Sequence, residues 1–288
     1  MSHQTDKSPR FDVYDHPRLS DEDHLVYPVV SRRAGGVSLG INLNPSKNCS
    51  FHCVYCQVDR STPIDNLSVN LEQIERELAG WLDTLKNPSH DLSGIPLKDI
   101  SIAGDGEPTL CRQLPDLIDL LVGFKSDRQL DGVGLILFTN GSSINRKALK
   151  DRLPAFFQAG GQIWFKLDFW DERSYLAINR SKVPYRRILD NLVEIGSLFP
   201  LVLQSCFFSR SDQPFQLSNV QRYAALIAWL LEKGVKLEEI QVYTIARKPS
   251  ESSVKPLSNS QMDELFSVLD NQIDVPIKLI YSSGQKEA

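Results

Sequence analysis

Long hydrophobic runs are missing from this sequence. No apolar stretch approaches the ~18 residues needed to span a bilayer, and residues 1–7 are polar and carry no hydrophobic signal-peptide core. We therefore expect no membrane segment and a cytoplasmic protein.

Cysteine is also scarce, and the chain has no excess of positive charge. The chain has only five cysteines, and because three of them are crowded together they make a poor disulfide framework and are better suited to binding metal. The formal net charge of -4 argues against a broad, nonspecific grip on nucleic acid.

One local basic segment stands against this acidic balance. Tyr175 and Tyr185 lie among its cationic residues. These residues are Arg173, Arg180, Lys182, Arg186 and Arg187. Such a segment is typical either of a solvated helix face or of a site for RNA or phosphate. The sequence alone leaves both interpretations open.

The rest of the pattern predicts one large α/β domain. Residues 1–35 are polar and show no sustained period, so we interpret them as an N-terminal extension, with a core domain over 36–282 and a tail over 283–288. Six strand–helix units follow one another, and a further strand pattern comes last. The predicted strands are 37–43, 99–103, 133–138, 162–168, 201–208, 239–244 and 275–281. The predicted helices are 70–85, 114–124, one starting near 144, 185–198, 219–233 and 260–270.

Alternating strands and helices imply a mainly parallel sheet covered by helices with right-handed crossovers. In such folds the functional loops gather at the carboxyl ends of the strands. The residues that follow each predicted strand are therefore the first candidates for a site.

The loop after the first strand carries Cys49, Cys53 and Cys56 within eight residues. A cubane iron–sulfur cluster takes four thiolates, so three cysteines leave one iron open to a substrate or cofactor. A zinc site with His52 as fourth ligand is an alternative, although two adjacent ligands are sterically awkward in so short a loop. A set of buried structural thiols is a third.

Polar residues also follow the later strands. Gly106-Glu107-Pro108 ends the second strand and Thr139-Asn140-Gly141 the third. The first is either a turn or a site in which backbone approaches a ligand and the Glu107 carboxylate accepts from an ammonium. The second is either an Asn-Gly turn or a site in which Asn140 hydrogen-bonds a ligand.

The fourth and fifth strands add further candidates. Lys166 and Asp168 share one face of the fourth strand and could form a pair. Cys206, on the fifth strand, and Cys111 are read either as small core residues or, for Cys206, as a hydrogen-atom donor.

The cysteine spacing, with Tyr55 just before the last cysteine, resembles the signature of the radical SAM enzymes. Gly106-Glu107-Pro108 is similar to the Gly-Gly-Glu-Pro element of that superfamily, with Asp105 in place of the first glycine. Residues 38–45, 53–57 and 104–109 look most like the iron–sulfur oxidoreductases grouped with the wyosine-base synthases of tRNA.

This resemblance implies a partial (βα)6 TIM-like barrel of the radical SAM type. It implies one 4Fe–4S cluster on Cys49, Cys53 and Cys56, with S-adenosylmethionine chelating the open iron. The cofactor-binding residues that it implies are Tyr55, Asp105, Gly106, Glu107 and Asn140.

The implied activity is reductive cleavage of S-adenosylmethionine to a 5′-deoxyadenosyl radical that acts on an unidentified substrate, with RNA base modification as one interpretation. A one-electron donor such as flavodoxin or ferredoxin is implied as partner. Lys166, Asp168 and Cys206 are the candidate catalytic residues. A second cluster of the archaeal wyosine type lacks ligands, since only Cys111 and Cys206 remain.

Two alternative functions remain consistent with the sequence. One is an activase that generates a glycyl radical on a partner enzyme. The other is a metal-stabilised binding module without enzymatic activity.

Overall fold

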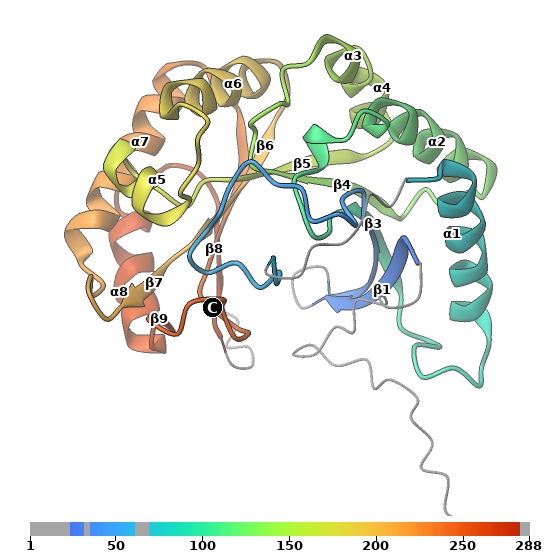
Figure 1. Ribbon diagram of the computed structural model, residues 1–288, viewed down its shortest axis with the longest axis horizontal. Coiled ribbons are helices and arrows are strands. Elements are labelled where there is room, and N and C mark those ends of the chain that lie inside the picture. Colours follow the sequence, from blue (N-terminus) through green and yellow to red (C-terminus); the bar gives the residue numbers. More distant parts are fainter. Residues whose placement is uncertain (1–23, 32–34, 61–68, 283–288) are drawn as a thin grey trace, which may run out of the picture.

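The computed structural model describes residues 24–31, 35–60 and 69–282. Its main sheet curls into a half-barrel with the helices outside it (Figure 1). The parallel strands, in spatial order, are β2 (Gly36–Ile41), β3 (Leu97–Ile102), β4 (Gly134–Thr139), β5 (Gly161–Lys166), β6 (Leu201–Cys206), β8 (Leu237–Tyr243) and β10 (Ile277–Ile280). All seven predicted strands are present, including the last, and the predicted α/β barrel is confirmed.

The helices form the outer layer of the half-barrel (Figure 1). They are α1 (Leu71–Lys86), α2 (Leu114–Asp127), α3 (Lys147–Lys150), α4 (Leu153–Gln158), α5 (Glu172–Ile178), α6 (Tyr185–Leu198), α7 (Leu217–Glu232) and α8 (Asn259–Asp270). A short 3-10 helix, η1 (Pro108–Leu110), follows the loop of residues 103–107, called here the glutamate loop. β7 (Phe208–Arg210) pairs with β9 (Val254–Pro256) in a small second sheet. Among the described residues, no helix is long and apolar enough to cross a membrane.

Local chemistry explains where the helices begin. The side chain of Asn70 caps α1 by accepting from the amides of Glu72 and Gln73. The helix predicted near residue 144 is divided into α3 and α4, since Pro154 in the first turn of α4 lacks the amide that would continue an earlier helix. The short helix α5 has no counterpart among the predictions.

The two faces of the strands differ in character. On β3, Ile100 and Ile102 belong to the main hydrophobic core, whereas Asp99 and Ser101 line a cavity inside the half-barrel. Because successive side chains point to opposite faces, one alternating strand supplies both surfaces. The interior of the half-barrel is therefore polar enough to receive a ligand.

An additional strand, β1 (Val26–Ser31), pairs antiparallel with β2. A Cβ atom at Gly40 would lie 2.5 Å from the ring of Tyr27 on β1, so the absence of a side chain there makes room for that ring. The sequence pattern did not predict this strand. The division at residue 35 stays a prediction, and residues 1–23, 32–34 and 283–288 of the extension and tail lie outside the described residues.

Candidate active site

The cysteine loop (residues 46–60) follows β2 and lies over the half-barrel. The thiols of Cys49, Cys53 and Cys56 line one cavity of about 440 Å³, called here the inner cavity. The other predicted site residues that line it are Tyr55, Asp105, Gly106, Glu107, Asn140, Lys166 and Cys206. Asp168 lies behind this lining, and Cys111 lies outside it.

The segment after α5 holds the cysteine loop in place. The amide of His52 donates to the carbonyl of Asn179 at 2.8 Å, and the hydroxyl of Ser181 donates to the carbonyl of Ser50 at 2.8 Å. Arg180, between them, has the left-handed φ of +47°, which is uncommon outside glycine. A sharp turn thus presents both neighbours of Arg180 to the loop.

Each of the three thiols receives an N–H donor. Asn179 Nδ2 lies 3.3 Å from Cys53 Sγ, Arg60 Nη1 lies 3.0 Å from Cys56 Sγ, and Asn140 Nδ2 lies 3.8 Å from Cys49 Sγ. Such donors stabilise a thiolate more than a thiol, and hydrogen bonds to cluster sulfurs tune the reduction potential.

Without a metal, burial keeps two of these groups protonated. It raises the pKa of Cys49 to about 11, with a contribution from Glu107, and the pKa of Cys53 to about 12. Metal ligation deprotonates thiols by supplying local positive charge. Three thiols on one cavity, each with a donor, therefore fit an iron–sulfur cluster.

A single-ion site does not form in the same place. Within residues 24–31, 35–60 and 69–282, no three His, Cys, Asp or Glu side chains converge as ligands of one metal ion. The exposed His52 instead lines a different cavity, so the arrangement does not support the zinc alternative.

The glutamate loop joins β3 to η1 and lies against the cysteine loop. The amide of Glu107 donates to the carbonyl of Asn48 at 2.9 Å. A Cβ at Gly106 would lie 2.0 Å from that same oxygen, so only glycine permits this approach. The predicted turn is thus also a contact between two functional loops.

The Glu107 carboxylate is buried and bound to the next loop as well. Oε1 accepts from the Thr109 amide and from the hydroxyls of Thr109 and Thr139, and Oε2 accepts from the Asn140 amide at 2.7 Å. Burial raises the pKa of Glu107, although these donors act in the opposite direction. The carboxylate therefore links the loops that follow β3 and β4.

Asn140 is itself turned toward the cysteine loop. Its Nδ2 donates to Ser50 Oγ at 3.0 Å, in addition to its approach to Cys49. The next residue, Gly141, has a φ of +76°, and a Cβ there would lie 2.1 Å from the ring of Phe165. Asn140 therefore positions the loop, and its contact with a cofactor stays a prediction.

Asp105 adopts an ordinary backbone conformation. Among the described residues other than glycine, left-handed φ values occur at Lys47, Gln129 and Arg180. Asp105 Oδ2 accepts from Asn42 Nδ2 at 2.8 Å, and its amide donates to Asn42 Oδ1 at 3.2 Å. The aspartate that replaces glycine thus ties the glutamate loop to the end of β2.

The predicted Lys166–Asp168 pair is present, with Nζ 3.3 Å from Oδ2. Asp168 also accepts from the Tyr55 hydroxyl and, at 2.8 Å, from the Cys206 amide. Burial would lower the pKa of Lys166, but the Asp168 carboxylate beside it raises this pKa well above its usual value. Lys166 and Cys206 line the inner cavity and Asp168 does not, and the catalytic roles of all three stay predictions.

Several residues of the site were not predicted from the sequence. Arg60 and Asn179 donate to cluster cysteines, and Asn179 is 126 positions away from its partner, so no local pattern identifies it. Ser38, Asp99 and Ser101 form a hydrogen-bonded polar group in the inner cavity. The sequence pattern that could have identified them is the alternation of polar and apolar residues along β2 and β3, whose apolar side chains are buried.

Comparisons with known proteins agree with this geometry. The model of the Radical SAM superfamily matches residues 43–208. The UPF0026 protein of Methanocaldococcus jannaschii is 32% identical over 259 residues, which cover 85% of this chain and 71% of the relative. The UPF0026 protein of Helicobacter pylori strain J99 is 28% identical over 236 residues, covering 82% and 70%.

A solved structure shows the same fold. A radical SAM methyltransferase from Sphaerobacter thermophilus superimposes with a TM-score of 0.62 at 11% identity, covering 90% of this chain and 70% of that one. The superfamily uses a 4Fe–4S cluster and S-adenosylmethionine, in agreement with the donor set described above. The chain belongs to the radical SAM superfamily of enzymes.

Proposed function

We propose that this enzyme holds one 4Fe–4S cluster on Cys49, Cys53 and Cys56 and cleaves S-adenosylmethionine in the inner cavity. When bound, the two cofactors supply a one-electron cleavage of a carbon–sulfur bond, which gives methionine and a 5′-deoxyadenosyl radical that acts on a substrate. The observation that carries the proposal is that the three thiols and Glu107 line the same cavity.

The glutamate loop supplies the binding site for the methionyl ammonium. Glu107 Oε2 accepts only the Asn140 amide among the described residues, so it retains acceptor capacity toward the cavity. Gly106 lets the glutamate loop pack directly against the cysteine loop, and it lines the inner cavity beside Glu107. An ammonium placed there would also offset the cost of burying the Glu107 carboxylate.

The other wall of the inner cavity receives the substrate. Lys166 and Cys206 line that wall, together with Gln204 and Tyr243. Lys166 Nζ lies 4.7 Å from the centre of the Tyr55 ring, which fixes the ammonium between the cysteine loop and β5. We assign to Lys166 the orientation of an anionic or carbonyl-bearing substrate, and to Cys206 the donation of a hydrogen atom.

The test compares Cys53→Ala with Cys111→Ala after anaerobic reconstitution with iron and sulfide. Wild type and the Cys111 variant should bind about four irons per chain and form 5′-deoxyadenosine with dithionite. The Cys53 variant should lose both, because it lacks a thiolate of the cluster. Equal iron content and product in all three proteins would refute the proposal.

RNA as the substrate stays a prediction, and the buried Tyr175 weakens the argument for it from the basic segment. Tyr175 is fully buried and its hydroxyl donates to the Val183 carbonyl at 2.7 Å, and the ring of Tyr185 packs against Phe169. The Tyr175 ring is therefore not presented for base stacking, whereas Tyr185 is half-buried. The comparisons give no support to the glycyl-radical activase.

A further inference from the structure

The proposed chemistry requires one electron from outside the chain. Only Cys111 and Cys206 remain beyond the cluster cysteines, which is too few thiolates for a second cubane. No internal relay of that kind can be built, so a donor has to approach the cluster itself. The surface nearest the cluster cysteines is therefore where a donor must dock.

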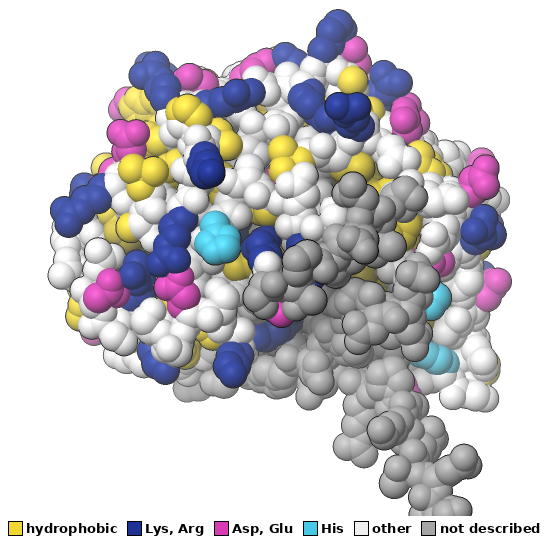
Figure 2. Space-filling model, viewed as in Figure 1, with side chains coloured by type: hydrophobic (Ala, Val, Ile, Leu, Met, Phe, Trp, Pro, Cys, Tyr) yellow, Lys and Arg dark blue, Asp and Glu magenta, His cyan; other side chains and the backbone are white. Residues whose placement is uncertain are grey.

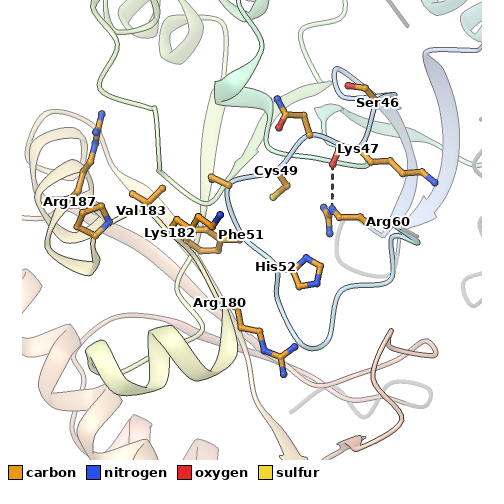
Figure 3. Close-up of a pocket in the computed structure, with 13 residues that line it drawn as sticks. Ser46, Lys47, Cys49, Phe51, His52, Arg60, Arg180, Lys182, Val183 and Arg187 are labelled. Carbon is orange, nitrogen blue, oxygen red and sulfur yellow. Dashed lines mark hydrogen bonds between the residues drawn. The ribbon is translucent and has the colours of Figure 1, made fainter. Parts of the chain in front are cut away.

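A second cavity, the outer cavity, provides such a surface. Its volume is about 930 Å³, and it is lined by residues of the cysteine loop, Cys49 among them, and by the segment from Arg180 to Arg187, which runs from the end of α5 into α6. Figure 3 shows His52 at its centre, with cations from both segments around it. A cluster ligand is thus accessible from a side that the inner cavity does not use.

The outer cavity has a strongly cationic lining. The charged residues that the structure describes in it are Lys47, Arg60, Arg180, Lys182 and Arg187, and no carboxylate is among the described lining residues. Within the part of the chain that the structure describes, only Arg180 among them forms a salt bridge, with Glu251. The space-filling view shows Lys and Arg side chains gathered over this region, in a chain whose formal charge is -4 (Figure 2).

The surroundings favour a protein over a nucleic acid. Leu176 on α5, one turn before Arg180, is 52% exposed, and Val183 lines the cavity. Apolar contacts beside charged ones are typical of protein interfaces, whereas the buried Tyr175 removes a platform for bases.

We propose that the outer cavity and its cations dock an acidic one-electron carrier protein, which delivers its electron to the cluster beside Cys49. This rests on the proposed function. The complementary charges steer the encounter, and a small electron-transfer interface of this kind has a dissociation constant on the order of micromolar. One electron leaves the carrier and reduces the cluster, with no bond formed between the two proteins.

The test uses the double variant Lys182→Glu/Arg187→Glu, since both side chains are exposed and lie outside the inner cavity. Arg76→Glu/Lys86→Glu on α1 is the control with the same change in net charge. The probe is a purified acidic flavodoxin. At low salt the cavity variant should bind it roughly tenfold more weakly or worse, while the control binds like wild type.

Reduction kinetics separate docking from catalysis. With reduced flavodoxin, the cavity variant should reduce its cluster and form 5′-deoxyadenosine roughly tenfold more slowly than wild type, whereas dithionite should serve both equally. Loss of activity with both reductants would overturn the docking assignment, because the residues would then act on cofactor or substrate. Should wild type make no product with dithionite, the proposed function fails and the flavodoxin affinities still decide the docking.

Binding of total tRNA to the same variants tests the alternative that this surface binds RNA. Unchanged flavodoxin binding in the cavity variant, together with lost binding of total tRNA, would assign this surface to RNA and refute the proposal. Equal thermal unfolding temperatures of wild type and both variants are required, and Lys182→Gln/Arg187→Gln should give an intermediate affinity if the effect is electrostatic.

Discussion

Two buried carboxylates are hydrogen-bonded to the loops of the site and hold these loops together. Glu107 and Asp168 are both almost fully buried, yet each joins segments that are distant in sequence through several donors. A buried carboxylate is tolerated where its lone pairs are satisfied. The sequence located both residues, but it did not reveal that they hold the loops together.

Asp99 yields a prediction at the residue scale. Burial raises its pKa to about 6, although Ser38 donates to it. In the unfolded chain this carboxyl ionises near pH ~3.9. The native state therefore holds the proton more tightly, and its stability falls as the pH rises from about 4 through 6.

Replacing Asp99 by Asn removes this ionisation while retaining an acceptor for Ser38. The stability of Asp99→Asn relative to wild type should increase by about 1 to 1.5 kcal/mol between pH 5 and pH 8. Urea unfolding at both pH values measures this difference. A difference that does not change with pH would contradict the assignment.

Among the elements, the regular ones were predicted more closely than the loops. Helix α6 has the predicted bounds, and α1 starts one residue from the prediction, because periodic apolar residues and a capping Asn70 are local signals. Helix α5 was missed although Asp171 and Ser174 form a local capping box at its start, and strand β1 was missed because it is stabilised by a partner elsewhere in the chain. Tyr27 on β1, for example, packs over Gly40.

The contact between the two functional loops can be tested with Gly106→Ala. The added methyl group would overlap the Asn48 carbonyl and should cost about 1 to 3 kcal/mol of unfolding free energy. The iron content after reconstitution should also fall, because the cysteine loop must shift. Gly132→Ala is the matched control, since a Cβ there meets no atom within 4 Å. Equal stability and iron content of the two variants would disprove the contact.

At the scale of the whole molecule, the described part of the half-barrel leaves two strands with one neighbour each. β1 and β10 end the sheet, whereas β4 and β5 lie between two partners. Edge amides depend on fewer contacts and open more easily.

Hydrogen exchange should follow this order. Amides of β4 and β5 should exchange at least about tenfold more slowly than those of β1 and β10, because local opening exposes the edges first. Exchange followed by mass spectrometry on the intact chain measures both sets in one experiment. Protection of β1 and β10 equal to that of β4 and β5 would mean that a further element covers the edges.

By itself, the sequence determined the strand and helix alternation, the superfamily and the residues able to supply thiolates. These are carried by local periodicity and by the spacing of Cys49, Cys53 and Cys56. Only the tertiary structure decided which residues support them: Arg60 and Asn179 donate to the cysteines, and Asp168 anchors Tyr55. It also decided that Lys182 and Arg187 share a cavity with Cys49. Such contacts depend on where a curled sheet brings its strand ends together, and no window of neighbouring residues contains that information.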